Sequence, residues 1–348
     1  MLPVALVGGC VDLISEHTSN VGEITRDCVV PPPADAVALD APVSLEYPGA
    51  SLWIWDHVEL TGGGTVANAA ARVTSAGDTC DAGPILLRDA AGHPRSLLAL
   101  SAAEQADNAA RTDGKQLALV PSGGVVVDGV GYLYYDHVLR GPGLFDAVTL
   151  GTGLCVLRSD AAACERVADG SGATLLWTPD ARVMNRGGLV IDEDGTRHAV
   201  IAGCRRVAEL TTTCTIAGVP VASLEDPAAY RELSVFAGWV DQLTDASVFA
   251  DEAGSVTLSA YDGGFLATSL DIFESRFYVR RSTRAVSNYE HRIAAFDAVP
   301  QTTLFVRGGR EHAALRPDPR TIVVSYATSG AAAPGLHLVT YRFHGDFQ

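Results

Sequence analysis

A short aromatic pattern occurs twice in this sequence and limits what the chain can fold into. Residues 53–58 read Trp-Ile-Trp-Asp-His-Val, and residues 133–138 read Leu-Tyr-Tyr-Asp-His-Val, 80 positions later (136 − 56). Compositional bias does not produce two such copies of three large apolar or aromatic residues followed by Asp-His-Val. Their recurrence indicates a repeated β unit, and the long period suits four-stranded propeller blades that carry long loops.

The rest of the chain follows the same rhythm. Apolar runs of strand length alternate with turn signals such as Asp128-Gly129 and Asp262-Gly263, which are typical of hairpins. Helical periodicity is nearly absent. We therefore predict an all-β, five-bladed β-propeller that forms one domain over residues 40–348, because a radial array hides most strand edges. The five units are expected to begin near residues 41, 116, 175, 235 and 303.

Composition narrows the class of partner. Apolar residues make up 47% of the chain and charged residues 19%, which is enough apolar material for a large core and gives no sign of disorder. The formal net charge of −16 repels phosphate backbones and argues against a nucleic-acid partner. The sequence also lacks a Gly-x-Ser-x-Gly elbow, a Walker loop and a His-Glu-x-x-His motif.

Six of the seven cysteines can be grouped into pairs. The pairs are Cys155 with Cys164, Cys204 with Cys214, and, at longer range, Cys28 with Cys80. Each of the first two pairs flanks a short loop and could staple a hairpin. The alternative is seven reduced, buried thiols in a cytosolic enzyme. No cysteine or histidine spacing is typical of zinc, and we expect no metal or cofactor.

Cys10 is left alone at the end of an apolar N-terminal run, Leu-Val-Gly-Gly-Cys. Small residues before a lone cysteine resemble a bacterial lipoprotein cleavage site, although residues 1–9 carry no positive n-region and are short for a signal. We predict that residues 1–10 are the end of a signal segment and that Cys10 carries lipid. Residues 11–39, which contain Pro31-Pro32-Pro33, are predicted to be a polar tether. The expected location is the bacterial cell envelope or the extracellular space.

Two segments resemble a known family. Residues 186–195 read Arg-Gly-Gly-Leu-Val-Ile-Asp-Glu-Asp-Gly, and residues 312–326 end in Arg-Thr-Ile-Val-Val-Ser-Tyr. Both resemble the DUF4185-type five-bladed propellers, which are common among exported bacterial proteins. Some members are glycoside hydrolases that cut arabinan, and they resemble other furanosidase and fructosidase propellers. The resemblance implies a carbohydrate-active propeller. This chain departs from the family where its aromatic strand ends Trp-Asp-His in place of Gly-Asp-Thr.

Glycoside hydrolysis needs one protonated and one ionised carboxyl group on either side of the scissile bond. Under the family resemblance, Asp40, Asp56 and Glu311 are the candidates for this pair and its pKa modulator, and Asp40 is the counterpart of an early family aspartate. His312 and Asn185 are the candidates for hydrogen bonds to substrate. We predict hydrolysis of furanoside-containing glycans by a monomer that binds polysaccharide or cell-surface glycan.

A second interpretation stays open. The duplicated Asp-His pairs at residues 56–57 and 136–137 suit strand ends as well as chemistry, and we interpret Asp136, the copy, as structural. The acidic run at residues 192–195 fits a hairpin turn better than a calcium loop, because further oxygen ligands are missing. The alternative function is a non-catalytic surface lipoprotein that binds glycan or protein.

Overall fold

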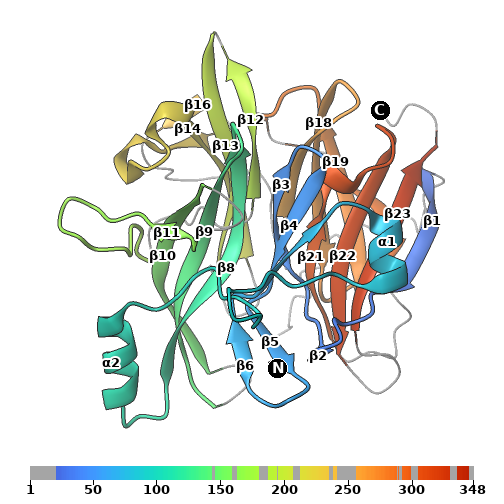
Figure 1. Ribbon diagram of the computed structural model, residues 1–348. Helices are drawn as coiled ribbons and strands as arrows, with labels where there is room; N and C mark the ends of the chain where they lie inside the picture. Colours follow the sequence, from blue (N-terminus) through green and yellow to red (C-terminus); the bar gives the residue numbers. More distant parts are fainter. Residues whose placement is uncertain are drawn as a thin grey trace, which may run out of the picture.

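The computed structural model describes residues 21–142, 146–158, 163–179, 187–193, 195–206, 212–234, 238–240, 256–287, 289, 292–298, 305–329 and 335–344. Their strands form antiparallel sheets that stand around a common centre (Figure 1). The innermost strand of each blade contacts the innermost strand of the next, in the closed order β3, β8, β12, β17, β21 and back to β3. This closed ring of five strands confirms the predicted five-bladed propeller.

The blades follow one another along the chain. The first contains β3 (Val43–Tyr47), β4 (Ala50–Ile54) and β7 (Ala70–Val73), and the second β8 (Gln116–Val127), β9 (Val130–Arg140), β10 (Ala147–Leu157) and β11 (Glu165–Arg166). The third contains β12 (Gly187–Glu193), β13 (Thr196–Arg206), β14 (Thr212–Pro220), β15 (Arg231–Ser234) and β16 (Gly238–Val240). The fourth contains β17 (Val256–Tyr261), β18 (Gly264–Asp271), β19 (Arg276–Ser282) and β20 (Ile293–Asp297).

The fifth blade joins the two ends of the described chain. Its strands are β21 (Phe305–Glu311), β22 (Thr321–Ser329), β23 (Gly335–Phe343) and β1 (Gly22–Val29). β1 pairs antiparallel with β23, from Gly22 opposite Phe343 to Val29 opposite His337, and Figure 1 shows it at the outer edge of this blade. We expected a polar tether over residues 11–39, but residues 22–29 of this segment form strand β1. As an edge strand with mostly exposed side chains, β1 has no apolar alternation to reveal it.

Smaller elements decorate the blades. β2 (Ala36–Ala38), β5 (His57–Leu60) and β6 (Thr65–Ala67) form a separate three-stranded sheet. In the sequence, β2 precedes the first blade, and β5 and β6 lie between its strands β4 and β7. The helices are α1 (Ala76–Ala82) and α2 (Ala102–Ala110), with 3-10 turns η1 (Val221–Ser223), η2 (Pro227–Ala229) and η3 (Ala313–Leu315). Neither α-helix was expected. No helix among the described residues is long and apolar enough to cross a membrane.

Two predicted blade boundaries were wrong. Residues 175–177 were expected to open the third unit, but Leu176 and Trp177 hydrogen-bond to the carbonyl oxygen of Thr152 in the second blade. Residues 238–240 were assigned to the fourth unit and form β16, the outermost strand of the third blade. Alternating apolar residues identify a strand, but they do not identify the sheet that it joins.

The core is a ring of five apolar clusters, one between each pair of neighbouring blades. They are represented by Trp53 and Val323, Leu52 and Leu133, Val125 and Ile201, Val200 and Leu258, and Leu270 and Ile322. The first copy of the repeated pattern begins at the end of β4 and runs into β5, and the second copy lies in β9. Trp53, Trp55, Tyr134 and Tyr135 have no exposed surface. These aromatic residues therefore stabilise the blade interfaces and do not contact a ligand.

Three disulfides confirm the predicted cysteine pairs. Cys155–Cys164 and Cys204–Cys214 close short loops, and Cys28–Cys80 ties β1 to α1 across 52 residues. Such bonds persist in oxidising compartments, which indicates an extracytoplasmic location. Cys10 lies outside the described residues.

Candidate functional site on the propeller axis

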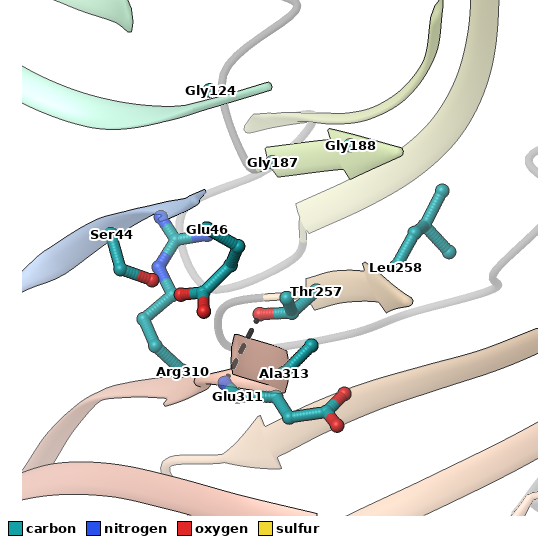
Figure 2. A pocket seen from close by; sticks show the side chains of 10 residues that line it. All are labelled: Ser44, Glu46, Gly124, Gly187, Gly188, Thr257, Leu258, Arg310, Glu311 and Ala313. Atoms are coloured by element: carbon teal, nitrogen blue, oxygen red, sulfur yellow. Dashed lines mark hydrogen bonds between the residues drawn. The ribbon is translucent and has the colours of Figure 1, made fainter. Parts of the chain in front are cut away.

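One cavity lies where the five inner strands converge, and we call it the axis cavity. It is lined by Ser44, Glu46, Gly124, Gly187, Gly188, Thr257, Leu258, Arg310, Glu311 and Ala313 (Figure 2). Every inner strand contributes at least one of these residues. The cavity has room for about one water-sized group. Side chains from distant parts of the sequence therefore meet in a narrow polar space.

Strand alternation places Ser44 and Glu46 on the cavity wall. In β3 the intervening residues Leu45 and Tyr47 are buried in the apolar cluster between the first and second blades, and successive side chains point to opposite faces of a strand. Across the cavity, Gly187 has a φ of 120°, in the region that favours glycine. A larger side chain there would be strained, so the wall stays open at this point.

Arg310 crosses the axis. It comes from β21 in the fifth blade, is 4% exposed, and donates from Nη2 to the carbonyl oxygen of Ser122 in β8 of the second blade. These two strands are not neighbours in the ring, since β3 lies between them. The guanidinium of Arg310 therefore links the fifth blade to the second and places a positive charge at the wall of the axis cavity (Figure 2).

Glu311, a predicted catalytic residue, is fully buried in an ion pair. Its Oε1 accepts a 2.8 Å bond from Nε of Arg316 and a second bond from Nη2, and its Oε2 accepts bonds from Ser259 (2.8 Å) and Thr268 (3.1 Å). The side chain has no exposed surface. Paired with a bidentate arginine and with both oxygens occupied, this carboxylate is arranged to join the fourth and fifth blades.

His312, predicted to bind substrate, is also fully buried. Its ring lies 4.7 Å from that of Trp53, and Nε2 lies 2.8 Å from Oγ of Ser325. Nδ1 lies 3.6 Å from Oε1 of Glu46. His312 therefore reaches the axis cavity only through Glu46.

Glu46, which was not among the predicted site residues, also lines the axis cavity. Its Oε1 accepts a 2.8 Å bond from Ser51 and its Oε2 a 2.9 Å bond from the amide of Ala314. Burial opposes ionisation of this carboxyl group, but the hydrogen bond and charge of His312 outweigh burial and lower its pKa. The strand alternation could have identified it. Glu46 shares a face of β3 with Ser44, and the apolar residues Leu45 and Tyr47 lie on the opposite face.

Asp40 and Asp56 gather at the other end of β3. Asp40 accepts a 2.9 Å bond from Nε of Arg307, and Asp56 accepts a 2.5 Å bond from Nη2 of Arg140. Burial opposes ionisation of Asp56, but His57 and Arg140 lower its pKa. The hydrogen bond that Asp56 accepts from His57, assisted by the charge of Asp40, raises the pKa of His57.

The structure therefore brings Asp40 and Asp56 together but not with Glu311. Arg307, the partner of Asp40, and Glu311 are four residues apart on β21, and the pairing of this strand is irregular between Arg307 and Arg310. Asp136, interpreted as structural, accepts a 2.8 Å bond from Thr152 within its own blade. Asn185 lies outside the described residues. Within the part of the chain that the structure describes, no three His, Cys, Asp or Glu side chains are grouped for a metal.

Solved structures share this architecture. A putative hydrolase from Bacteroides ovatus matches with a TM-score of 0.60 at 11% identity, over 91% of this chain and 87% of that one. The GH43_1 enzyme from Xanthomonas citri, complexed with xylose, matches with a TM-score of 0.50 at 9% identity, over 89% and 90% of the two chains. No protein-family model and no curated protein matches the sequence. The chain thus shares the propeller fold of glycoside hydrolases, and at such identities the likeness concerns the fold.

Proposed function

We propose that this chain is an extracytoplasmic propeller that binds a pentose-containing glycan at its axis. The observation that carries the proposal is the axis cavity, where Ser44, Glu46, Thr257 and Arg310 converge from the first, fourth and fifth blades. Few, convergent polar groups in a concave site are the usual means of orienting a small ligand. Xylose is the first ligand to test, because the Xanthomonas citri enzyme with this fold is complexed with xylose.

Binding fits the described geometry better than hydrolysis by the predicted residues. A general acid must hold a proton near neutral pH, which requires a raised pKa. The pKa of Asp56 and that of Glu46 are lowered, and Glu311 is bonded to Arg316 through Oε1. The described carboxylates are thus arranged as hydrogen-bond acceptors.

Calorimetric titration of the purified full chain with xylose, xylotriose and arabinan tests the proposal. We expect saturable binding of at least one of these ligands, and at least fivefold weaker binding after Thr257→Val, which removes a cavity hydroxyl. Thr65→Val, on the exposed strand β6, is the control and should bind as the wild type does. Absence of saturable binding to all three ligands would refute the proposal.

Hydrolysis of a furanoside-containing glycan is the second candidate function. It is favoured by the approach of Asp40 and Asp56 to His57 at one end of the inner strands, in a fold shared with a putative hydrolase. Release of sugar from arabinan would be compared in the wild type, Asp40→Asn and Asp56→Asn. Loss of at least a hundredfold in both variants is expected if these carboxylates act as the catalytic pair. Undiminished release in both variants would exclude these roles.

We also propose that the chain belongs to the DUF4185-type family and that it is attached to a membrane. Lipid on Cys10 would hold the propeller at the cell envelope. Expression of the full chain in a bacterial host, followed by detergent phase partition, should place the wild type in the detergent phase and Cys10→Ser in the aqueous phase. Equal partition of both proteins would count against a lipid anchor.

A further inference from the structure

The three disulfides differ in how well the fold shields them. Four of the cysteines are at most 8% exposed and lie inside apolar clusters between blades: Cys155, Cys164, Cys204 and Cys214. Cys28 and Cys80 are only partly buried, at the margin of the cluster between the fifth and first blades. Because a thiolate must touch a disulfide sulfur to reduce it, Cys28–Cys80 is the disulfide that a reductant in solvent reaches first.

Cys28 is the residue that anchors β1 to the body of the propeller. The other side chains of this strand are exposed, since only Gly22 and Cys28 are partly buried and Gly22 has no side chain. β1 is the outermost strand of the fifth blade and pairs along one edge, with β23. Thr25 donates to a carbonyl oxygen of β23, and Asp27 lies 3.8 Å from His337. Without the disulfide, β1 is held by its pairing with one strand and by contacts of exposed side chains.

The other half of the disulfide lies on α1, a short helix that the first blade supplies. α1 follows β7 and contacts β23 (Figure 1), and Thr79 is its one buried residue. Asp81 of α1 lies 3.7 Å from Arg26 of β1, but these side chains are 74% and 43% exposed, so their ion pair contributes little. The disulfide is therefore the strong tie between α1 and β1, and it crosses the seam between the first and fifth blades.

We propose that Cys28–Cys80 is a redox-sensitive latch, which a dithiol reductant opens while the other two disulfides stay closed. One thiolate of the reductant attacks a sulfur of the latch, the S–S bond breaks, and a mixed disulfide forms. The second thiolate of the reductant then displaces the bound cysteine. Two electrons and two protons pass from the dithiol to Cys28 and Cys80, which end as thiols, and the reductant ends as a disulfide.

Opening the latch changes the seam and leaves the ring intact. The ring consists of β3, β8, β12, β17 and β21, so neither β1 nor α1 belongs to it. Reduction removes the loop closure between residues 28 and 80, which lowers the free energy needed for local opening of β1. Each opening uncovers the edge of β23 from His337 to Phe343, and a free strand edge can pair with another chain. The latch thus controls a strand edge, independently of the proposed sugar site.

Partial reduction measures the accessibility of the latch. The oxidised full chain would be treated with dithiothreitol under native conditions, quenched with iodoacetamide at a series of times, and mapped by peptide mass spectrometry. We expect Cys28 and Cys80 to be alkylated at least tenfold faster than the four buried cysteines. Equal rates for the three pairs, or faster reduction of another pair, would overturn the latch.

Hydrogen exchange measures the release of β1. The amides of residues 22–29 should exchange at least tenfold faster in the reduced chain than in the oxidised chain. The amides of the five inner strands should exchange at the same rate in both forms, because the ring does not depend on the latch. Unchanged exchange in β1, or faster exchange in the inner strands, would contradict the proposal.

The double variant Cys28→Ser with Cys80→Ser is the matched control, because no reductant can change its latch. Its β1 should exchange rapidly with or without dithiothreitol, whereas Cys155→Ser with Cys164→Ser should keep the difference between oxidised and reduced forms. If the first variant does not fold, wild type alkylated at Cys28 and Cys80 after partial reduction takes its place. A response of β1 to dithiothreitol in the protein without the latch would assign the release to another disulfide and sink the proposal.

Discussion

Arg307 of the fifth blade donates from Nε to Oδ1 of Asp40, just before the first blade, at 2.9 Å. This contact crosses the seam where the last inner strand meets the first, and its two side chains are 52% and 30% exposed. An aspartate predicted to be catalytic thus also contributes to closure of the ring.

Asp40→Asn should have a small effect on stability. Exposed ion pairs contribute at most about 1 kcal/mol, so we expect the free energy of unfolding to fall by no more than that. Pentose binding should stay within twofold of the wild type, because Asp40 does not line the axis cavity. Urea unfolding and calorimetric titration measure the two quantities, and a tenfold loss of binding would place Asp40 in the ligand site.

Glu311→Gln should be strongly destabilising. Removing one partner of a buried ion pair leaves the other charge uncompensated and costs about 3–5 kcal/mol, here at Arg316, which is 10% exposed. The matched control is Glu225→Gln, since Glu225 pairs with Arg158 at 3.5 Å on the surface. Chemical unfolding should show a change of less than about 1 kcal/mol in the control. Equal effects of the two substitutions would contradict a structural role for Glu311.

Glu104 should make the fold sensitive to acid. Burial opposes its ionisation, but Arg166 and the capping contacts with Ser101 lower its pKa from 4.5 to about 2. The stabilisation is therefore present above pH 4.5 and is lost as the pH falls toward 2. Glu104→Gln should lower the free energy of unfolding at pH 7 by about 2 kcal/mol. In this variant the free energy of unfolding should also fall less steeply between pH 4.5 and about pH 2. A decline of unchanged steepness would contradict the assignment.

The two Asp-His copies should titrate differently. The hydrogen bond that Asp56 accepts raises the pKa of His57, whereas burial lowers the pKa of His137. Stabilisation from His57 is thus present below its ordinary pKa and is lost as the pH rises through the raised value. Imidazole titration by NMR should show a lower pKa for His57 in Asp56→Asn. The pKa of His57 should be unchanged in Asp136→Asn, the matched copy, and equal shifts in both variants would contradict this account.

Disulfide Cys28–Cys80 should contribute more to stability than Cys155–Cys164. The first closes a loop of 52 residues and the second a loop of 9. Loop-closure entropy predicts losses of about 4 and about 2.5 kcal/mol when each pair is changed to serine. Removal of Cys28–Cys80 would also release β1 from α1. Thermal unfolding of the two double variants compares them, and a greater loss from the Cys155–Cys164 pair would contradict the prediction.

Much of the scaffold could be predicted from local pattern. Alternating apolar residues and Asp-Gly turns located most of the strands, because a strand's side-chain period is a local property. The cysteine pairs were predictable because two of them close short loops within a hairpin. The boundaries between blades were not predictable. Trp177 pairs with Thr152 of the second blade, and such pairing depends on which sheet edge is free.

The candidate site was less accessible to sequence reasoning. The predicted set of Asp40, Asp56, Glu311 and His312 is split between the two ends of the inner strands, and Glu46 was missed. A glutamate before Pro-Gly suits a turn as well as a cavity wall. Its role depends on His312 and Ala314, more than 260 residues away in the chain, and no local pattern contains such a contact.

The sequence by itself determined an all-β chain of repeated units. The duplicated motif at residues 53–58 and 133–138 marked the repeat because each copy supplies large buried side chains to the interfaces between blades. Only the tertiary structure decided that β1 completes the fifth blade and that Arg310 spans the axis to Ser122. It also decided that the histidine pKa is raised in the first Asp-His copy and lowered by burial in the second. Those features arise from ring closure and burial, which bring together groups that the linear chain keeps apart.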